Sequence, residues 1–277
     1  GFTKLHRNRI IMFSVVIPLY NKELSIQNTI KSVLQQSFQE FEIVVVNDGS
    51  TDASVARVEE IDDSRIRVVH QKNQGVSAAR NKGVAEAKFS WIAFLDGDDL
   101  WETNHLQEVN EMIQLYPQEK VFATSFEYSD NRPMFRHPRD SKIVKVDDYF
   151  KDALKESMMW TSIVVVDKEA FNQAGKFDIQ LNRGEDLDLW ARLARFNSLV
   201  KSSAITGVYR VEAENRSTAS FDIKKSRVFS YSFYQARSDS EKQYYREQIT
   251  KTLRSFLVSK DIRLFIKLYA RHWKNVS

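Results

Sequence analysis

The first half of the chain alternates short apolar runs with stretches that have helical spacing. Four runs are mostly apolar, as expected of strands that are covered on both faces. These predicted strands span residues 13–18, 41–46, 65–70 and 90–95. Predicted helices separate them over residues 26–34, 51–61 and 76–87. A strand–helix series of this kind predicts an α/β fold with a mostly parallel central sheet between helices.

The pattern changes after residue 125. Residues 130–141 are polar and contain two prolines, so they are predicted to form a loop. A further apolar strand is predicted over residues 161–166, and Gly184-Glu185-Asp186 is predicted to open a helix with an apolar face. From residue 221 onward the chain is predicted to be helical, aromatic and basic.

We therefore expect three parts along the chain. Residues 1–11 precede Met12 and are interpreted as an added leader or a basic arm. Residues 12–220 form the α/β domain, and residues 221–277 form a helical C-terminal extension. Residues 222–277 carry 13 Lys and Arg against 5 Asp and Glu, whereas the preceding 221 residues carry 28 against 32. Any attraction to an acidic partner therefore belongs to the extension.

Composition narrows the class of protein. With 277 residues, 42% of them hydrophobic and 28% charged, the chain has the profile of a globular protein with a large core. No apolar run approaches the roughly 18 residues that cross a bilayer. The absence of cysteine excludes disulfides and thiolate metal sites and fits the cytosol. Five scattered histidines argue against a histidine-rich zinc site.

Three acidic residues follow the fourth predicted strand in the segment Asp96-Gly97-Asp98-Asp99. Like charges at this spacing repel one another unless a cation or hydrogen-bond donors neutralise them. Hard divalent ions such as Mg²⁺ or Mn²⁺ prefer oxygen ligands and often share them with substrate phosphates. The alternative is an acidic turn that only caps a helix beginning near Glu102.

Other polar motifs are predicted at the same rim, because ligands of such sheets bind beyond the carboxyl ends of the strands. These motifs are Pro18-Leu19-Tyr20-Asn21, Asn47-Asp48-Gly49-Ser50 and Asn73-Gln74-Gly75, with Arg80 in the helix that follows. Each alone could be an ordinary strand end or turn, but their shared location favours a nucleotide pocket. Neither the dinucleotide-binding glycine motif nor a P-loop is present. A diphosphate held by a carboxylate-bound metal fits better.

In order and spacing, these segments resemble the inverting family 2 glycosyltransferases with the GT-A fold. The likeness runs from about residue 13 to 217. The matching segments are Ser14-Val15-Val16-Ile17-Pro18-Leu19-Tyr20-Asn21, Asn47-Asp48-Gly49-Ser50-Thr51-Asp52, Asn73-Gln74-Gly75, Ala79-Arg80-Asn81-Lys82-Gly83, Phe94-Leu95-Asp96-Gly97-Asp98-Asp99 and Gly184-Glu185-Asp186. The resemblance implies metal-dependent transfer of a sugar from a nucleotide-diphosphate donor, with a UDP-sugar as the first candidate.

The resemblance also implies roles on the donor side. Pro18, Tyr20 and Asp48 correspond to the wall around the base and ribose, and Arg80 would neutralise or orient the nucleotide. Asp96 and Gly97 correspond to the start of the Asp-x-Asp motif near the ribose. Asp98 corresponds to the metal-binding residue, which would hold Mn²⁺ or Mg²⁺ against both phosphates. The chemistry agrees, because metal charge stabilises a departing nucleoside diphosphate.

On the acceptor side, Asp186 corresponds to the family's general base. It would take the proton from the acceptor hydroxyl as that oxygen attacks the anomeric carbon with inversion. Glu185 and Trp160 are predicted on the acceptor side, with Glu185 binding the acceptor or steadying the loop. One departure is Glu212, which stands where many relatives carry a histidine that helps the metal or diphosphate. A third metal ligand is therefore left open.

Two other functions stay open at this stage. A nucleotidyltransferase also joins an α/β sheet to acidic metal ligands, although it would need a glycine-rich basic loop after the first strand. A non-catalytic sugar-nucleotide-binding scaffold is the second alternative, and the presence of both Asp98 and Asp186 argues against it. The expected partners are the donor and a saccharide or lipid-linked acceptor in cell-surface polysaccharide or glycoconjugate synthesis, with no nucleic acid.

The last predicted helix carries basic and apolar residues on different faces. Arg263, Lys267, Arg271 and Lys274 share one face, and Ile262, Phe265, Ile266, Tyr269 and Trp273 share another. Either the apolar face packs on the catalytic domain, or the helix docks on an anionic membrane surface. The expected location is cytoplasmic, with the second alternative placing the protein at the inner face of the membrane.

Overall fold

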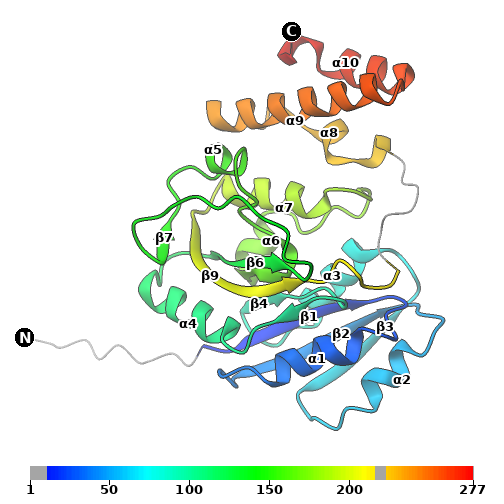
Figure 1. Ribbon diagram of the computed structural model, residues 1–277, viewed down its shortest axis with the longest axis vertical. Coiled ribbons are helices and arrows are strands. Elements are labelled where there is room, and N and C mark those ends of the chain that lie inside the picture. The colour runs from blue at the N-terminus through cyan, green and yellow to red at the C-terminus, as the bar shows by residue number, and fades with distance from the viewer. Residues whose placement is uncertain (1–10, 216–222, 277) are drawn as a thin grey trace, which may run out of the picture.

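A nine-stranded sheet forms the centre of the part that the computed structural model describes, residues 11–215 and 223–276 (Figure 1). The spatial order is β3-β2-β1-β4-β8-β6-β9-β5, and β7 pairs with β9. The strands are β1 (Phe13–Leu19), β2 (Phe41–Asp48), β3 (Ile66–Gln71), β4 (Trp91–Phe94), β5 (Leu100–Trp101), β6 (Val121–Tyr128), β7 (Ile143–Lys145), β8 (Val164–Asp167) and β9 (Leu199–Tyr209).

Helices connect these strands and form the C-terminal part. They are α1 (Ile26–Leu34), α2 (Ser54–Glu59), α3 (Val76–Glu86), α4 (His105–Leu115), α5 (Tyr149–Ala153), α6 (Lys168–Gln173), α7 (Glu185–Ala194), α8 (Arg227–Ser230), α9 (Asp239–Val258) and α10 (Ile262–Val276). Two short 3₁₀ helices cover Thr161–Ile163 and Ile223–Lys225.

The predicted α/β class with a central sheet between helices is confirmed. Strand β1 pairs in parallel with β2 and with β4, so Phe13 lies beside both Phe41 and Trp91. The parallel order ends at β8, which pairs antiparallel with β4 and with β6. The predicted strand over residues 161–166 begins late, because its first three residues form a 3₁₀ turn in which the Ile163 amide donates to the Trp160 carbonyl oxygen at 3.0 Å.

The two faces of the sheet are covered by different helices. Alternate residues of β1 point to opposite faces, as the pleat requires. Val15 and Ile17 pack in one apolar cluster with buried residues of α1, α2 and α4, whereas Val16 packs with residues of α3, α6 and α7. The carboxyl ends of β1, β2 and β4 are left uncovered between these two layers, which is where a ligand can approach.

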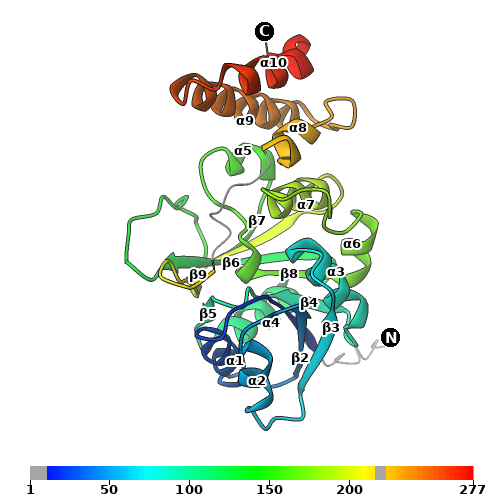
Figure 2. The same cartoon turned by 90° about the vertical axis from the view of Figure 1, so that its right-hand side faces the viewer.

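The C-terminal helices form a further layer. Figures 1 and 2 show α9 and α10 at one end of the molecule, beyond α7, with α1 and α2 at the opposite end. Buried residues of α9 and α10, among them Tyr244, Ile249 and Leu268, belong to the same apolar cluster as α7. The helical character predicted for this part is confirmed.

The predicted division of the chain into three parts stays a prediction. Residues 1–10 of the proposed leader and the proposed boundary near residue 220 lie outside the described residues. None of the helices within residues 11–215 and 223–276 combines the length and apolar character needed to cross a bilayer.

Candidate active site

A cavity of about 870 Å³ opens at the carboxyl ends of β1, β2 and β4. Its walls come from the turn after β1, the start of α3, the turn after β4 and the start of α7. Every residue predicted for the site lines this one cavity: Pro18, Tyr20, Asp48, Arg80, Asp96, Gly97, Asp98, Trp160, Glu185 and Asp186. The structure thus brings together residues that lie up to 168 positions apart.

The Asp96-Gly97-Asp98 turn is held tightly against β1 and α1. The Thr29 hydroxyl donates to the Gly97 carbonyl oxygen at 3.1 Å. A Cβ at Gly97 would lie 2.9 Å from the Pro18 carbonyl oxygen, so any larger residue would push the turn away from β1. The requirement for glycine is therefore steric, and it fixes where the neighbouring carboxylates point.

The three aspartates of this segment have three different partners. Asp96 accepts a hydrogen bond from Arg80 at 2.7 Å, and Asp98 accepts one from Lys22 at 2.6 Å. Asp99 is buried and accepts from the Ser162 hydroxyl and the Arg210 amide. Burial raises the pKa of Asp99 well above its ordinary value, and the charges of Asp98 and Asp96 raise it further. All three aspartates line the cavity, and Asp99 also ties the segment to Ser162 and Arg210.

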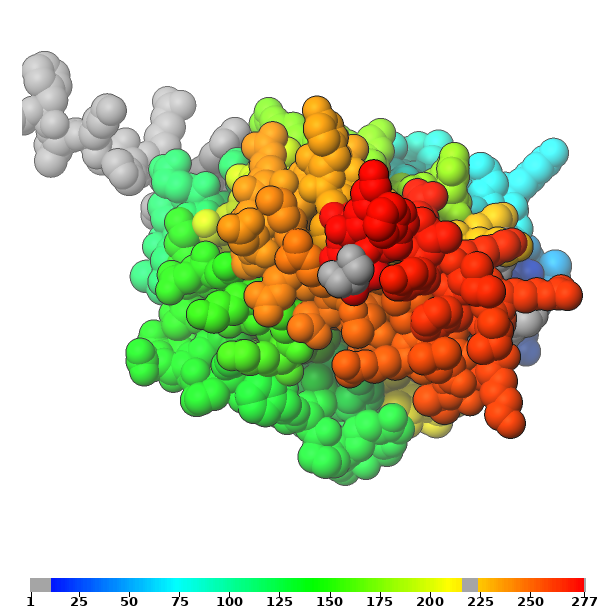
Figure 3. Space-filling model, turned by 90° about the horizontal axis from the view of Figure 1, so that it is seen from above, coloured from blue at the N-terminus to red at the C-terminus, as the bar shows by residue number. Residues whose placement is uncertain are grey.

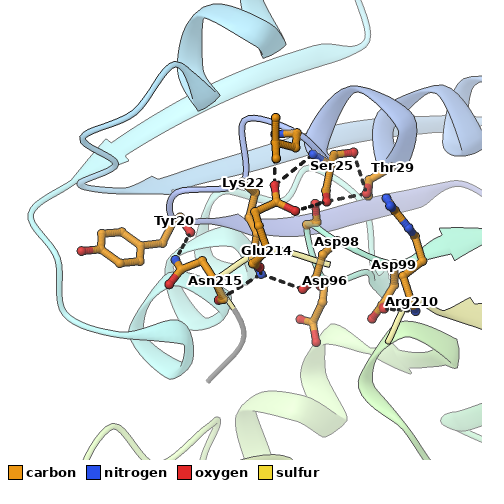
Figure 4. A network of polar contacts seen from close by, with 12 residues as sticks. Tyr20, Lys22, Ser25, Thr29, Asp96, Asp98, Asp99, Arg210, Glu214 and Asn215 are labelled. Carbon is orange, nitrogen blue, oxygen red and sulfur yellow. Dashed lines mark hydrogen bonds and ion pairs between the residues drawn. The ribbon is translucent and has the colours of Figure 1, made fainter. Parts of the chain in front are cut away.

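Lys22 is a site residue that the sequence motifs did not indicate. Its ammonium group lies between Asp98 and two backbone carbonyl oxygens (Figure 4). It donates to the Glu214 carbonyl oxygen at 2.5 Å and to the Asn215 carbonyl oxygen at 3.1 Å. It therefore supplies the cation that the acidic turn requires in this structure. Nothing local distinguishes Lys22 from a surface lysine, because its partners follow 76 and 192 positions later.

The segment after β9 closes one side of the cavity. Glu214 accepts hydrogen bonds from the backbone amides of Leu24 and Ser25, both at 3.0 Å, just before α1 begins. The Asn215 side-chain amide donates to the Tyr20 carbonyl oxygen at 3.0 Å. A carboxylate at a helix N-terminus is favoured by the helix dipole. This contact attaches the segment after β9 to the start of α1.

Asp48 is almost fully buried and already has three hydrogen-bond donors. One carboxylate oxygen accepts from the Gln71 side chain and the Gln74 amide, and the other accepts from the Gly75 amide, all at 2.8 Å. Asp48 therefore shapes the loop before α3 while it also lines the cavity. Tyr20 is much more exposed than Asp48, because 39% of its surface is accessible. Its ring points away from the aspartates in Figure 4.

Gly184 places the two acids of the next motif at the start of α7. It has a φ of +73°, and a Cβ there would meet the Arg227 side chain at 2.8 Å. Glu185 then accepts from Arg80 at 3.0 Å, so one buried guanidinium joins the turn after β4 to the start of α7. This contact supports the loop-steadying alternative for Glu185.

Asp186 is a second carboxyl group of the cavity with a raised pKa. Burial raises its pKa to about 6, Glu185 adds to the rise, and Arg80 and Arg227 oppose it. Its carboxylate accepts from the Leu187 amide at 2.7 Å. A carboxylate with a pKa near neutrality is suited to accept a proton during a reaction.

Aromatic rings form the wall on the side of Trp160. Trp160 packs against Phe126 at 4.5 Å and Tyr209 at 5.2 Å between ring centroids. Behind this wall the buried Lys201 donates to the Met158 carbonyl oxygen at 2.9 Å, and burial lowers its pKa to about 7. A flat aromatic surface of this kind can stack against the apolar face of a sugar ring.

A divalent cation in the cavity would meet the carboxylate of Asp98. Among residues 11–215 and 223–276, no three histidine or acidic side chains converge on one point. Glu212 contacts Ser129 and Arg210 and does not line the cavity, so it supplies no third ligand. Asp98 nevertheless fits Mg²⁺ or Mn²⁺, which commonly take one or two carboxylates and complete their shell with substrate phosphates and water. The metal would have to replace Lys22 at Asp98.

The fold is α/β, and its cavity brings the acidic turn after β4 together with the carboxylate of Asp186. The model of glycosyl transferase family 2 matches residues 14–175, which is more than half of the chain. The chain therefore belongs to glycosyltransferase family 2. This confirms the family that the sequence motifs indicated.

Several curated relatives share part of the chain. It is 33% identical over 195 residues to TuaG of Bacillus subtilis, a glycosyltransferase named for teichuronic acid biosynthesis, with 66% of this chain and 72% of that protein covered. It is 36% identical over 132 residues to the uncharacterized glycosyltransferase EpsJ of the same organism, covering 47% of this chain and 38% of that protein. The match thus spans well under half of EpsJ.

The fold matches solved structures of S. aureus TarS. The TarS 1–349 complex with UDP-GlcNAc superposes with a TM-score of 0.72 at 19% identity, over 86% of this chain and 71% of that chain. TarS 1–349 alone covers 96% of this chain and 89% of that chain with a TM-score of 0.63. At this identity the likeness concerns the fold, and it includes the helical C-terminal part.

Proposed function

We propose that this protein transfers a sugar from a nucleotide-diphosphate donor to a hydroxyl group of an acceptor, with inversion at the anomeric carbon. The observation that carries the proposal is the meeting of the acidic turn after β4 with the raised-pKa carboxylate of Asp186 in one cavity. The first group suits a diphosphate with its counter-ion, and the second suits proton removal from an attacking hydroxyl. A single displacement needs only one catalytic carboxylate, unlike the two of a retaining glycosidase.

Each wall of the cavity has a place in this reaction. Pro18, Tyr20 and Asp48 would border the base and ribose, with Arg80 fixing the Asp96 carboxylate near the ribose. Asp186 would accept the proton of the acceptor hydroxyl, and Trp160 would stack on the acceptor or the transferred sugar. Glu185 would keep Arg80 and the start of α7 in place, so that Asp186 stays within reach of the hydroxyl.

Asp98 would hold Mg²⁺ or Mn²⁺, which when bound would offset the charge of the departing nucleoside diphosphate. Lys22, no longer paired with Asp98, would then be available to donate to a phosphate oxygen. The chain thus has both a carboxylate for the cation and a cation of its own at the same point.

The donor class we favour is a UDP-sugar, and the acceptor a saccharide or lipid-linked hydroxyl in cell-surface polysaccharide synthesis. The support is a fold neighbour solved with UDP-GlcNAc and a relative named for teichuronic acid biosynthesis. The decisive test is product formation from a panel of UDP-, GDP- and dTDP-sugars, without acceptor and then with candidate acceptors. Binding without turnover of any donor would contradict an enzyme and favour a scaffold.

Asp98→Ala is expected to abolish the metal dependence of donor binding while the protein stays folded. Its carboxylate is the proposed contact to the cation, and its removal also relieves repulsion with Asp96 and Asp99. Calorimetric titration with the donor found in the panel, with and without Mn²⁺, measures the effect. Asp62→Ala, which removes an exposed aspartate, is the matched control and should behave as the wild type. Unchanged metal dependence in Asp98→Ala would refute the assignment.

A further inference from the structure

Helix α10 has three faces, and only one of them is covered by the rest of the described chain. Leu268 and His272 are buried against the preceding helices, and the His272 ring lies 2.9 Å from the Val228 carbonyl oxygen. These two residues, four positions apart, lie on one side of the helix. They show which side of α10 faces the domain.

A second face is apolar and exposed. Its residues follow one another at spacings of four, three and four positions, which places them on one stripe about 16 Å long. They are Ile262, Ile266, Tyr269 and Trp273, with exposed fractions of 52%, 59%, 41% and 51%. At the end of α9, Leu257 and Val258 are exposed as well, with exposed fractions of 51% and 85%. The alternative that the whole apolar face packs on the domain is therefore wrong for these residues, although the half-buried Phe265 does pack there.

The third face is basic and borders the apolar stripe. Arg263, Lys267, Arg271 and Lys274 are all exposed. From residue 251 to the end, the sequence contains seven Lys and Arg and a single acidic residue, Asp261. Figure 3 shows α9 and α10 spread across the end of the molecule that lies beyond α7. An apolar stripe edged by basic residues, with Trp and Tyr in it, matches helices that lie flat at a lipid surface.

We propose that α10 docks this protein on a membrane that contains anionic lipid, with the stripe Ile262, Ile266, Tyr269 and Trp273 inserted among the headgroups. Charge complementarity selects this occupant. A second copy of the chain seated on the same face would bring its own basic row against this one, which is repulsive. A lipid surface instead offers phosphates to the basic row and an acyl boundary to the apolar stripe.

This docking is independent of the proposed reaction, so vesicle binding and turnover of the donor are measured separately. The chain is mixed with phosphatidylcholine vesicles, with and without phosphatidylglycerol, and the bound fraction is measured by co-sedimentation at ~0.1 M and ~0.5 M salt. We expect binding only to the anionic vesicles and its loss at the higher salt. Turnover of the donor in vesicle-free solution should be the same for all variants below.

Two double variants separate the faces of the helix. Ile266→Ser with Trp273→Ser removes half of the apolar stripe, and Lys267→Glu with Lys274→Glu reverses half of the basic row. Each is expected to weaken binding at least about tenfold, because both insertion and charge contribute. All four residues are exposed, so the fold does not depend on their side chains. Leu115→Ser with Ile179→Ser alters exposed apolar residues elsewhere and should bind as the wild type.

Other outcomes overturn the proposal. Equal binding to neutral vesicles, or binding that salt does not affect, would exclude the basic row as a determinant. Analytical ultracentrifugation without lipid is the second measurement. A dimer that the Ile266→Ser, Trp273→Ser variant disperses would assign the stripe to a second copy of the chain.

Discussion

Asp186→Asn is expected to lower kcat by about 10²–10⁴-fold and to leave nucleotide affinity unchanged. The amide keeps the size of the side chain and its hydrogen bond from the Leu187 amide, but it cannot accept a proton. Steady-state transfer kinetics combined with calorimetric titration of the nucleotide measure the two effects separately. Asp188→Asn, two positions on in the same helix and paired with Arg192, is the matched control and should keep most of its turnover.

The raised pKa of Asp186 also sets the direction of two pH dependences. As the base, it must be ionised, so kcat/KM should fall as the pH drops below about 6, and this limb should disappear in Asp186→Asn. For stability, the folded state binds more protons than the unfolded state between the ordinary pKa of 3.8 and about 6. The free energy of unfolding therefore decreases as the pH rises through this window. Above it, Asp186→Asn should be the more stable protein.

These two results together identify the role of the residue. A variant that kept near-native turnover would require another base. Loss of turnover without a gain in stability at pH 8 would contradict the burial that raises the pKa. A carboxylate retained despite a cost in stability is common at functional sites.

The parallel half of the fold could be predicted from the sequence because its signals are local. Residues 13–18 and 41–46 are buried on both faces of the sheet and therefore read as apolar runs, in which only Ser14 and Glu42 are polar. Strand β9 gave no such signal, since Lys201 and Ser202 interrupt it although both are buried. Their polar groups are satisfied by the Met158 carbonyl oxygen and by Glu108, far away in the chain. Burial of this kind cannot be recognised before the fold is known.

The residues of the site likewise fall into those that local sequence patterns locate and those that only the fold reveals. The acidic turn after β4 and the acids opening α7 could be located because each follows or begins an element with a clear pattern. Lys22, Glu214 and Arg227 could not, because each matters only through a partner that the fold brings to it. Arg227 is the clearest case, since its side chain packs against Gly184 while its guanidinium donates to Tyr244 of α9 at 2.7 Å. Through Arg227, the C-terminal helices thus contact the start of α7.

The second large effect is expected for Arg80→Met, which should lower the free energy of unfolding by about 3 kcal/mol or more. Arg80 is only 4% exposed and pairs with both Asp96 and Glu185, so its removal leaves two carboxylates without their counter-charge. Methionine fills much of the same volume and can still contact the Phe177 ring. The measured change therefore reports the loss of the charge and not the loss of packing. Urea unfolding at pH 7 measures the change.

Two further measurements distinguish this bridge from an ordinary surface ion pair. Arg57→Met removes the exposed pair with Glu60 and should cost within about 0–1 kcal/mol. Because Arg80 also holds down the pKa of Asp186, Arg80→Met should move the acidic limb of kcat/KM to higher pH. Arg80→Lys keeps one charge but cannot reach both carboxylates with a planar fork, so an intermediate result is expected. An Arg80→Met protein no less stable than Arg57→Met, with an unmoved acidic limb, would mean that the bridge between the two acidic motifs contributes nothing to either property.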